Sequence, residues 1–361
     1  MTRMRAAIVG TGDVARLHAE AIAARNDAEV VVAVDVDVDA DRAAAFAAKY
    51  GIPLSATSLP DTDLDVVHLC TPPAGHAVQA EEAFARGAHV VVEKPPALSL
   101  ADVDRMVSAA EAAGRQLAVV FQQRTGSAAA HVKRLLDDGA LGRPLVARCD
   151  TFWFRDDGYF AAPWRGTWAS EGGGTTLGHG IHQLDLLAYL LAYLLGDVDE
   201  VRGQAWRVAR DIETEDVSTA VLRFESGVVA TAMTSAVSPR QASSIRIDTE
   251  LATVELEHLY GHGHGNWRIT PRPGQDAPAG WAFPEAETPS GHDAYIDAVY
   301  PALASGGLLP SVAAAPARSM EIVAAIYASS ERDAAVRLSE VRESAPLRGP
   351  MSAHVRDERS R

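Results

Sequence analysis

The sequence feature that most constrains the fold is a glycine-rich turn near the N-terminus. The apolar residues 6–9 form a predicted strand, and Gly10-Thr11-Gly12-Asp13-Val14-Ala15 follows it directly, ahead of a helix-prone run. In this G-x-G-x-x-A pattern the first glycine allows a tight turn, the second lets the backbone approach a pyrophosphate, and the alanine permits close packing of helix on strand. The helix N-terminus offers unpaired N–H groups and positive potential to phosphates. The pattern therefore predicts a dinucleotide-binding site.

The second predicted strand ends in an acid that favours NAD over NADP. Residues 30–34 are apolar and lead to Asp35, about 20 residues past the turn, where a carboxylate hydrogen-bonds the adenosine ribose hydroxyls. The same carboxylate repels a 2′-phosphate. Residues 36–39 provide no arginine to neutralise one, and Arg42 is the nearby basic residue that could reach round. We therefore expect NAD as the cofactor, with NADP less favoured.

A further strand end carries a lysine on a stiff corner. Glu93-Lys94-Pro95-Pro96 directly follows the apolar run 88–92. Proline fixes its own φ and biases the preceding residue away from helix, so Lys94 should project from a rigid, extended backbone. Ligands of open α/β sheets bind in the crevice outside the carboxyl ends of the strands. Lys94 is therefore a candidate catalytic residue, and the alternative is a solvated strand-to-helix turn.

Strands and helices alternate up to residue 123, which predicts a parallel sheet covered by helices on both faces. A strand over 65–70 ends in Thr71-Pro72, and a helix is expected to begin at His76 and run to Arg86. A second helix is expected at 100–113 and another strand at 116–121. Residues 1–123 are thus predicted to form a Rossmann domain with a doubly wound parallel sheet.

The pattern changes after residue 123. A predicted helix at 127–138 leads to a strand at 144–154, and period-two stretches recur between residues 201 and 270. Consecutive strands joined by short turns predict a large, open, mostly antiparallel sheet, with one face available for pairing subunits. A loop and two helices are expected at 271–289, 292–305 and 313–330.

The predicted fold class is therefore α/β, with two domains and a tail. Because 361 residues exceed what one hydrophobic core usually serves, we expect a second domain, an α/β domain over residues 124–340 for substrate binding and oligomerisation. The remaining residues, 341–361, are polar and without periodicity, which predicts a disordered tail.

Between the two predicted sheets lies a stretch dense in aromatic, arginine and glycine residues, 152–185. Aromatic faces suit the C–H faces of a sugar ring, while arginine and aspartate suit its hydroxyls, so this stretch is a candidate ligand wall. The glycines 172–174 should let the backbone come close to a neighbour. On the helix that begins near Gly180, His182 and Asp185 are three residues apart, so Asp185 could orient His182. The alternative is a core histidine hydrogen-bonded at a helix start.

Composition excludes several classes of function. Acidic residues outnumber basic ones 48 to 33, giving a net charge of −15, which repels nucleic acid and anionic membrane surfaces. The longest apolar run, 186–195, has about half of the ~20 residues that a membrane helix needs. The two cysteines, Cys70 and Cys149, lack metal-site spacing and are expected to be reduced and buried. We therefore expect a soluble cytoplasmic protein that binds neither nucleic acid nor membrane.

Taken together, these motifs resemble the Gfo/Idh/MocA family of NAD(P)-dependent sugar and cyclitol oxidoreductases over roughly residues 5–335. The resemblance rests on the glycine turn and on four further groups: Thr71-Pro72 with His76, Glu93-Lys94-Pro95, Trp164-Arg165-Gly166, and Gly172-Gly173-Gly174 with His182 and Asp185. It implies a Rossmann domain plus an open-sheet domain that forms homodimers or homotetramers. It also implies hydride transfer between NAD and a secondary alcohol or ketone, with Lys94 and His182 in proton transfer.

The resemblance, with the motifs above, yields a set of candidate site residues and no metal site. Catalysis is assigned to Lys94 and His182. Cofactor binding is assigned to Gly10, Thr11, Gly12, Asp13, Val14, Asp35, Thr71, Pro72, His76, Glu93, Lys94 and Gln122. Substrate binding is assigned to Arg124, Arg155, Tyr159, Trp164, Arg165, His179, His182 and Asp185.

The sequence departs from the family pattern in two places. Many family dehydrogenases carry an aspartate four residues before the histidine, and here that position is Gly178, followed by an additional histidine, His179. This departure puts the proton relay and the substrate subgroup in question. The second departure is a tandem of four residues at 186–193, which should lengthen the helix by about one turn.

Three alternatives to a dehydrogenase stay open. The first is a redox-neutral enzyme that oxidises and re-reduces a sugar, and the second is an NAD-dependent sensor that needs no proton relay. The third is a metalloenzyme built on His258, His262 and His264. Because no carboxylate or cysteine stands at a supporting spacing, we interpret that cluster as a hairpin loop.

Overall fold

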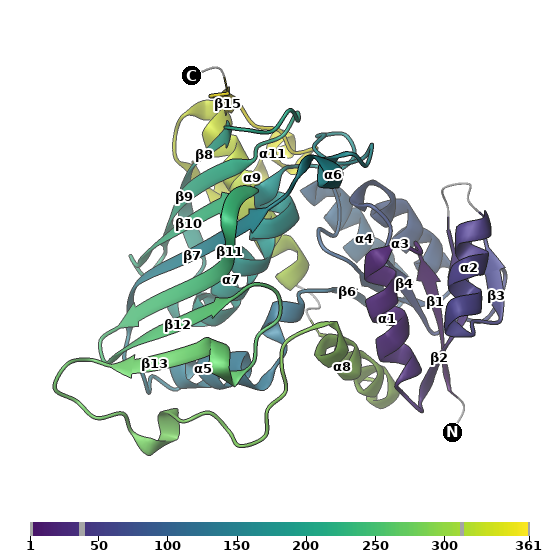
Figure 1. Ribbon diagram of the computed structural model, residues 1–361, viewed down its shortest axis with the longest axis horizontal. Helices are drawn as coiled ribbons and strands as arrows, with labels where there is room; N and C mark the ends of the chain where they lie inside the picture. Colours follow the sequence, from purple (N-terminus) through teal and green to yellow (C-terminus); the bar gives the residue numbers. More distant parts are fainter. Residues whose placement is uncertain (1–2, 36–39, 311–313, 360–361) are drawn as a thin grey trace. The chain divides into compact units, whose positions relative to one another are not determined.

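The computed structural model describes residues 3–35, 40–310 and 314–359 and divides into two compact units (Figure 1). The first unit comprises Met1–Val120 and His292–Ala317, and the second comprises Phe121–Gly291 and Arg318–Arg361. The sequence analysis assigned the helix at 292–305 to the second domain, but in the structure this helix is part of the first unit. Residues 36–39, which contain no arginine, lie outside the described residues.

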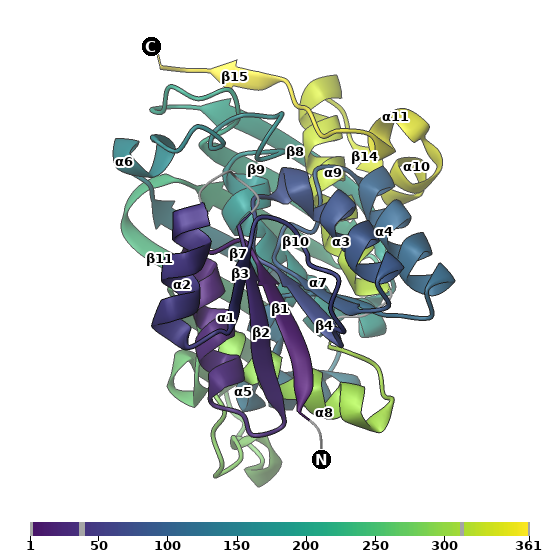
Figure 2. The ribbon, with the colours of Figure 1, turned by 90° about the vertical axis from the view of Figure 1, so that its right-hand side faces the viewer.

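The first unit is built on a six-stranded sheet whose strands all run parallel, in the order β3-β2-β1-β4-β5-β6. Strands β1 to β4 of this sheet are labelled in Figure 2. The strands are β1 (Met4–Val9), β2 (Ala28–Val34), β3 (Leu54–Ala56), β4 (Val66–Leu69), β5 (His89–Val92) and β6 (Leu117–Val119). The helices are α1 (Asp13–Ala23), α2 (Ala40–Tyr50), α3 (His76–Ala85), α4 (Leu100–Ala112) and α8 (His292–Ser305). The predicted Rossmann sheet is confirmed.

The core of this sheet follows from its composition. Every residue of β4 is buried, and β1, β2 and β5 are buried along most of their length, as expected for parallel strands covered on both faces. Ala15 is fully buried, in agreement with the close helix-to-strand packing predicted for it. Helix α8 packs against α1 and buries Tyr295 and Tyr300 in the same core. This packing explains why α8 belongs to the first unit.

The second unit is built on a nine-stranded sheet of mostly antiparallel strands, in the order β13-β12-β11-β7-β10-β9-β8-β14, with β15 beside β8. Only the β7–β10 and β8–β15 pairs described are parallel. The strands are β7 (Pro144–Phe154), β8 (Val198–Arg207), β9 (Val217–Phe224), β10 (Val229–Ser235), β11 (Val237–Thr249), β12 (Ala252–His258), β13 (Trp267–Pro271), β14 (Val336–Arg337) and β15 (Val355–Asp357). The predicted open sheet is confirmed.

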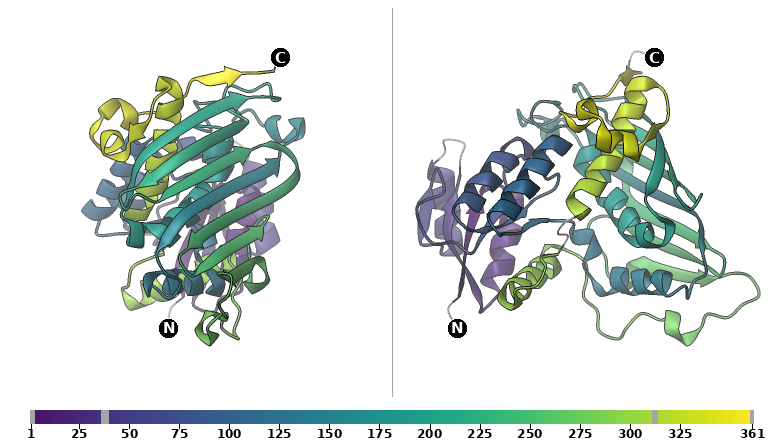
Figure 3. Two further views of the ribbon diagram at one scale, coloured as in Figure 1. Left: turned by 90° about the vertical axis from the view of Figure 1, so that its left-hand side faces the viewer. Right: turned by 180° about the vertical axis from the view of Figure 1, so that it is seen from behind.

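Helices cover one face of this sheet, and its other face is open. Helices α5 (Ser127–Asp137), α7 (Ile181–Leu195) and α9 (Ala314–Arg332) lie behind the strands in the left view of Figure 3. The central strands β7, β10 and β9 face the viewer there without a covering helix in the described part of the chain. No helix among the described residues is both long and apolar enough to cross a membrane.

The prediction of a disordered tail over 341–361 is wrong for the described part of that segment. Helix α10 (Leu338–Glu343) is followed by α11 (Ala345–Arg348), and β15 pairs with β8 in parallel. Ser330 Oγ donates to the carbonyl of His354 over 2.8 Å, and Arg207 forms an ion pair with Asp357 at 3.2 Å. The sequence analysis missed this strand because its partner, β8, lies about 150 residues earlier, as the spacing of Arg207 and Asp357 shows.

Candidate functional site

The glycine turn closes as the sequence predicted. Gly10 follows β1 with a φ of 89°, and its N–H donates to the carbonyl of Val34 on β2 over 2.8 Å. A Cβ at this position would lie 2.7 Å from the carbonyl carbon of Cys70 and from the nitrogen of Thr71. Both the positive φ and this close approach require glycine. The end of β1 is thereby packed directly against the end of β4.

The requirement for Gly12 has a different origin. Gly12 caps α1 without a side-chain hydrogen bond, and a Cβ there would meet only Arg42 Nη2, at 4.0 Å. The protein's own packing therefore leaves room for a side chain at Gly12. Helix α1 begins at Asp13, and the N–H groups of its first turn, which includes Val14, donate to no capping side chain at Gly12. An uncapped helix N-terminus with an open glycine fits a pyrophosphate.

Asp35 follows the last residue of β2, as predicted, and is buried. The hydroxyl of Thr11 donates to Asp35 Oδ2, which joins the glycine turn to the strand end. Arg42 Nε lies 3.9 Å from the same carboxylate oxygen, and the Arg42 side chain is 56% exposed. The basic residue that the sequence singled out is thus close to the acid that should select the cofactor.

Thr71, Pro72 and His76 lie together after β4. Pro72 starts a short turn, η1 (Pro73–Gly75), which leads into α3 at His76. The buried His76 ring places Nε2 at 2.8 Å from the carbonyl of Thr71 and Nδ1 at 3.1 Å from the carbonyl of Pro95. His76 therefore touches the chain after β4 and the chain after β5, which are neighbouring strand ends of one sheet.

Lys94 is the second residue after β5 and is half-buried. Its backbone N–H donates to Glu93 Oε2 over 3.3 Å, and the Lys94–Pro95 peptide is cis. The carboxylate of Glu93 is buried, and its Oε1 lies 3.0 Å from His18 Nε2 and 2.8 Å from His292 Nε2. The sequence analysis missed both histidines, although His18 interrupts an alanine-rich helix face.

In the second unit, the rings of Trp153 and Tyr260 lie beside His182. Trp153 at the end of β7 lies with its ring centroid 6.1 Å from that of His182 and 4.9 Å from that of His179. Tyr260, two residues after β12, has its ring 5.7 Å from His182. His182 is in the first turn of α7, and His179 is in η3 (Thr176–Gly180), a π-helical turn of the kind often found at functional sites. Tyr260 was absent from the predicted site.

A charged cluster extends from His179. Arg155 Nε donates to His179 Nε2 over 3.2 Å, and the hydroxyl of Tyr159 lies 3.2 Å from the same nitrogen. Arg165 donates to the Tyr159 hydroxyl and forms an ion pair of 2.9 Å with the buried Glu171. Trp164 packs under the Arg165 guanidinium at 4.1 Å. The structure thus brings together the predicted residues Arg155, Tyr159, Trp164, Arg165 and His179, and adds Glu171 to them.

The predicted orientation of His182 by Asp185 is wrong. Both oxygens of the buried Asp185 accept hydrogen bonds from Arg124, at 2.6 and 2.5 Å, and Oδ1 also accepts from Ser319 Oγ at 2.6 Å. The carboxylate is therefore hydrogen-bonded to Arg124 and Ser319. Burial raises the pKa of Asp185 and Arg124 opposes that rise. This pairing favours a structural role for Arg124 and Asp185, and their predicted substrate contacts stay predictions.

The glycine run approaches the protein itself rather than an open space. A Cβ on Gly174 would lie 1.9 Å from the carbonyl oxygen of Glu215, and one on Gly173 would lie 2.3 Å from the Tyr327 hydroxyl. Glu215 is fully buried and accepts from the N–H of Thr176 over 2.8 Å. The close neighbour expected for these glycines is therefore the packed interior beneath η3.

Three remaining features of the sequence analysis are Gln122, Gly178 and the tandem at 186–193. Gln122 is buried in the second unit, and its Nε2 donates to the Tyr260 hydroxyl. A Cβ on Gly178 would lie 3.7 Å from Glu171 Oε1. The additional tandem is part of α7, which is continuous from Ile181 to Leu195.

The prediction that the histidines at 258–264 lie in a hairpin is confirmed. β12 and β13 pair antiparallel, and His262 Nδ1 accepts from the indole of Trp267 at 3.0 Å. His258 Nε2 lies 3.3 Å from Gln183 Nε2, and His264 Nε2 lies 2.6 Å from Ser127 Oγ. Burial lowers the pKa of His258 to about 3 and that of His262 to about 4.

The first unit has a six-stranded parallel sheet with a glycine turn and a lysine at its strand ends, and the second has an open, mostly antiparallel sheet. These features define a class of two-domain, nucleotide-dependent enzymes. Residues 4–121 match the family model described as an oxidoreductase family with an NAD-binding Rossmann fold. Residues 129–255 match the GFO/IDH/MocA C-terminal domain. The chain belongs to the Gfo/Idh/MocA oxidoreductase family.

Known relatives share this architecture. The WlbA dehydrogenase from Bordetella pertussis, solved with NADH and UDP-GlcNAcA, superposes with a TM-score of 0.82 at 29% identity, over 93% of this chain and 98% of that chain. D-apiose dehydrogenase of Paraburkholderia graminis is 33% identical over 63% of this chain and 59% of its own length. Myo-inositol 2-dehydrogenase of Thermotoga maritima is 29% identical over 63% and 66%. The chain spans about half the length of the curated relatives it matches.

Proposed function

We propose that this protein transfers a hydride between NAD and a secondary alcohol or ketone of a sugar, glycoside or cyclitol. The observation that carries the proposal is the placement of Lys94, two residues after the end of β5, on the strand-end edge of the sheet that also holds the Gly10–Gly12 turn. This edge is where ligands bind in open α/β sheets. The named activities of the relatives, on D-apiose and myo-inositol, support a sugar or cyclitol substrate.

The residues of the first unit fit a dinucleotide. Gly12 and the uncapped start of α1 would hold the pyrophosphate, and Asp35 would accept hydrogen bonds from the adenosine ribose. NAD would supply the hydride acceptor. The remaining task of the protein is to position the substrate oxygen and to move its proton.

We assign that task to Lys94 and His182. Oxidation of an alcohol sends a hydride to the cofactor and leaves a proton on the oxygen that must be removed. Lys94 would hydrogen-bond this oxygen, and the imidazole of His182 would take the proton, or return it in the reverse direction. Tyr260 and Trp153, whose rings surround His182, would exclude water from it. The cluster of Arg155, Tyr159, Arg165 and His179 would bind the substrate's polar groups.

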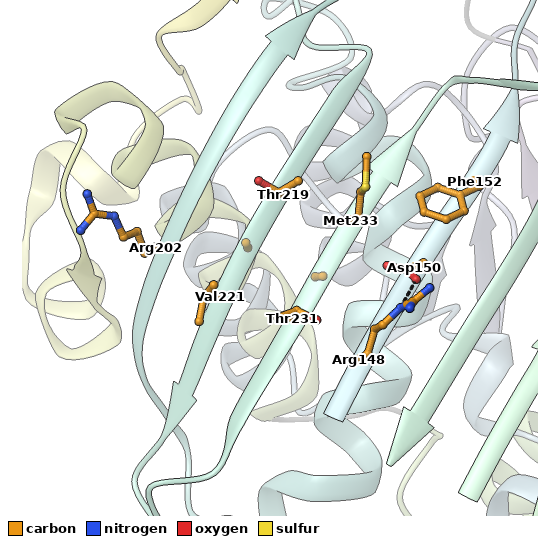
Figure 4. Close-up of a pocket in the computed structure, with 10 residues that line it drawn as sticks. Arg148, Asp150, Phe152, Arg202, Thr219, Val221, Thr231 and Met233 are labelled. Atoms are coloured by element: carbon orange, nitrogen blue, oxygen red, sulfur yellow. Dashed lines mark hydrogen bonds and ion pairs between the residues drawn. The ribbon is translucent and has the colours of Figure 1, made fainter. Parts of the chain in front are cut away.

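A homodimer or homotetramer through the open sheet face is a further part of the proposal. Val146, Val221, Val229 and Met233 are exposed on the adjoining strands β7, β9 and β10. A shallow hollow lies between them, lined by Phe152, Thr219, Val221, Thr231 and Met233, with an Arg148–Asp150 ion pair at its side (Figure 4). An apolar surface of this kind is typical of interfaces. The two free, buried cysteines agree with a cytoplasmic location, which also stays a proposal.

The test is NADH absorbance with purified protein, NAD, and a panel of sugars, inositols and glycosides, repeated with NADP. The proposal predicts a substrate-dependent signal with NAD that is weaker with NADP. Product formation without net NADH would instead indicate a redox-neutral enzyme. Tight NAD binding by calorimetry with no reaction on any substrate would indicate a sensor and would contradict the proposed function.

A further inference from the structure

The residue before Lys94 is held by a buried chain of hydrogen bonds within the first unit. Glu93 Oε1 lies at hydrogen-bond distance from two histidine nitrogens, 3.0 Å from His18 Nε2 and 2.8 Å from His292 Nε2. His18 Nδ1 lies 2.8 Å from His68 Nδ1, and His68 Nε2 lies 3.0 Å from the hydroxyl of Tyr300. All five side chains are at least nine-tenths buried, and they come from α1, β4, α8 and the end of β5.

The chemistry of these groups fixes which group donates and which accepts in each of these hydrogen bonds. Burial lowers the pKa of His18 and of His68, so both rings are neutral at neutral pH. Burial alone would raise the pKa of Glu93, but the facing His292 and His18 hold it well below its usual range, so the carboxylate is ionised. A carboxylate only accepts, so His18 donates through Nε2. His18 Nδ1 must then accept from His68, and His68 Nε2 must accept from Tyr300.

The other oxygen of Glu93 connects this chain to Lys94. Glu93 Oε2 accepts the backbone N–H of Lys94 at 3.3 Å, while Oε1 is occupied by the two histidines. A buried carboxylate that loses a donor is destabilised, and it turns toward whatever donor is left. The rotamer of Glu93, and with it the backbone at Lys94, therefore depends on His18 and His292.

We propose that His18 and His292 are positioning residues which, through the Glu93 carboxylate, fix the backbone from which Lys94 projects. The importance of this position for turnover rests on the proposed function. The same two histidines and carboxylate are also side chains that zinc binds. Both nitrogens, however, lie at hydrogen-bond distance from one carboxylate oxygen. The hydrogen bonds that run from Tyr300 through His68 account for the donor role of His18.

The first test compares two replacements of His292. His292→Gln keeps an N–H donor near the position of Nε2 but cannot ionise, whereas His292→Leu removes the donor. We expect the leucine variant to lose about 10²-fold in kcat, the effect of a misplacement near 1 Å, while its Kd for NAD stays within about twofold. The glutamine variant should restore most of kcat. Equal kcat values for the two variants would overturn the proposal.

The second test observes Lys94 without relying on activity. The chain has only three lysines, Lys49, Lys94 and Lys133, so reductive methylation with ¹³C-formaldehyde gives three side-chain signals besides the N-terminal amine. Lys49 lies on α2 of the first unit and Lys133 pairs with Asp137 in the second, so they report on the folding of each unit. The signal that Lys94→Met removes identifies Lys94.

The expected result is a shift of the Lys94 signal in His292→Leu, little shift in His292→Gln, and unchanged Lys49 and Lys133 signals in both. Glu93→Gln, which conserves volume, should move the Lys94 signal even if the leucine variant does not fold. An unmoved Lys94 signal in Glu93→Gln would overturn the proposal. So would a zinc ion that copurifies with the wild-type protein and is lost in His292→Leu. If these shifts occur but the wild-type protein oxidises no substrate, the proposed function fails and the positioning role stands.

Discussion

At the scale of single residues, cofactor choice depends on Asp35 and Arg42. The carboxylate accepts from the Thr11 hydroxyl and lies 3.9 Å from Arg42 Nε, so one buried acid and one exposed base share the region where a 2′-phosphate would lie. We expect Asp35→Ala to raise kcat/KM for NADP relative to NAD by about tenfold, which corresponds to about 1.4 kcal/mol. Adding Arg42→Ala should remove that gain. A ratio unchanged in Asp35→Ala would show that Asp35 does not select the cofactor.

The two glycines of the turn provide a matched pair of substitutions. Gly10→Ala places a Cβ 2.7 Å from the backbone at Cys70 and strains a φ of 89°, so we expect it to destabilise the fold by about 1 to 3 kcal/mol or more. Gly12→Ala meets only Arg42 Nη2 at 4.0 Å. It should leave the melting temperature unchanged and weaken NAD binding about tenfold or more. Calorimetric Kd values and thermal melts distinguish the two, and unimpaired NAD binding by Gly12→Ala would refute the assignment of this turn.

The residues that the sequence predicted best are those whose role depends on local backbone. Gly10 and Asp35 directly follow a strand and Lys94 is the second residue after one, so their placement at one sheet edge follows from the strand pattern. His292 and Tyr260 were missed because their contacts come from distant segments. The orientation of Asp185 was predicted wrongly, since helical spacing places it three residues from His182 but does not reveal Arg124 and Ser319.

At the scale of elements, the β12–β13 hairpin makes stability depend on pH. His258 and His262 are buried and neutral, with pKa values lowered by burial to about 3 and about 4. A histidine with a lowered pKa in the folded state contributes full stability above its unfolded pKa of about 6.5 and loses it as pH falls below that value. At pH ~5 each should cost about 2 kcal/mol relative to pH ~7.5. Denaturant unfolding at both pH values measures the difference.

A double variant, His258→Gln with His262→Gln, serves as the control for this effect. It should be less stable at neutral pH, because the indole of Trp267 loses a partner, but its stability should fall less on acidification. A difference between the two pH values as large as in the wild-type protein would show that other groups are responsible.

Element types were predictable, and their partners were less so. The strand at Pro144–Phe154 and the helix at His292–Ser305 occur with the predicted bounds, because each is a long periodic segment. The attachment of α8 to α1 and the pairing of β15 with β8 were not predicted. Both contacts join segments that are far apart in the sequence. Each contact depends on the residues of both partners, so the sequence of one segment alone does not predict it.

At the scale of the whole molecule, the open sheet face should decide the oligomeric state. Met233 is exposed on β10 between Thr219 of β9 and Asp150 of β7. Met233→Lys would place a charge in the apolar face and should reduce the mass measured by light scattering to that of the monomer. Val78→Lys is the control, because Val78 is 63% exposed but lies on α3. An oligomer that survives Met233→Lys, or a wild-type monomer, would contradict the proposed interface.

The central claim is that Lys94 acts on the substrate of an NAD-dependent dehydrogenase. The most direct test is to measure kcat and the Kd for NAD in Lys94→Met beside the wild-type protein, on a substrate found by the absorbance panel. Because general acid–base catalysis and positioning are lost together, the account predicts a fall in kcat of about 10²- to 10⁴-fold or more, with the Kd for NAD unchanged within about threefold. A variant that turns over like the wild-type protein, or one that loses NAD binding instead, would contradict it.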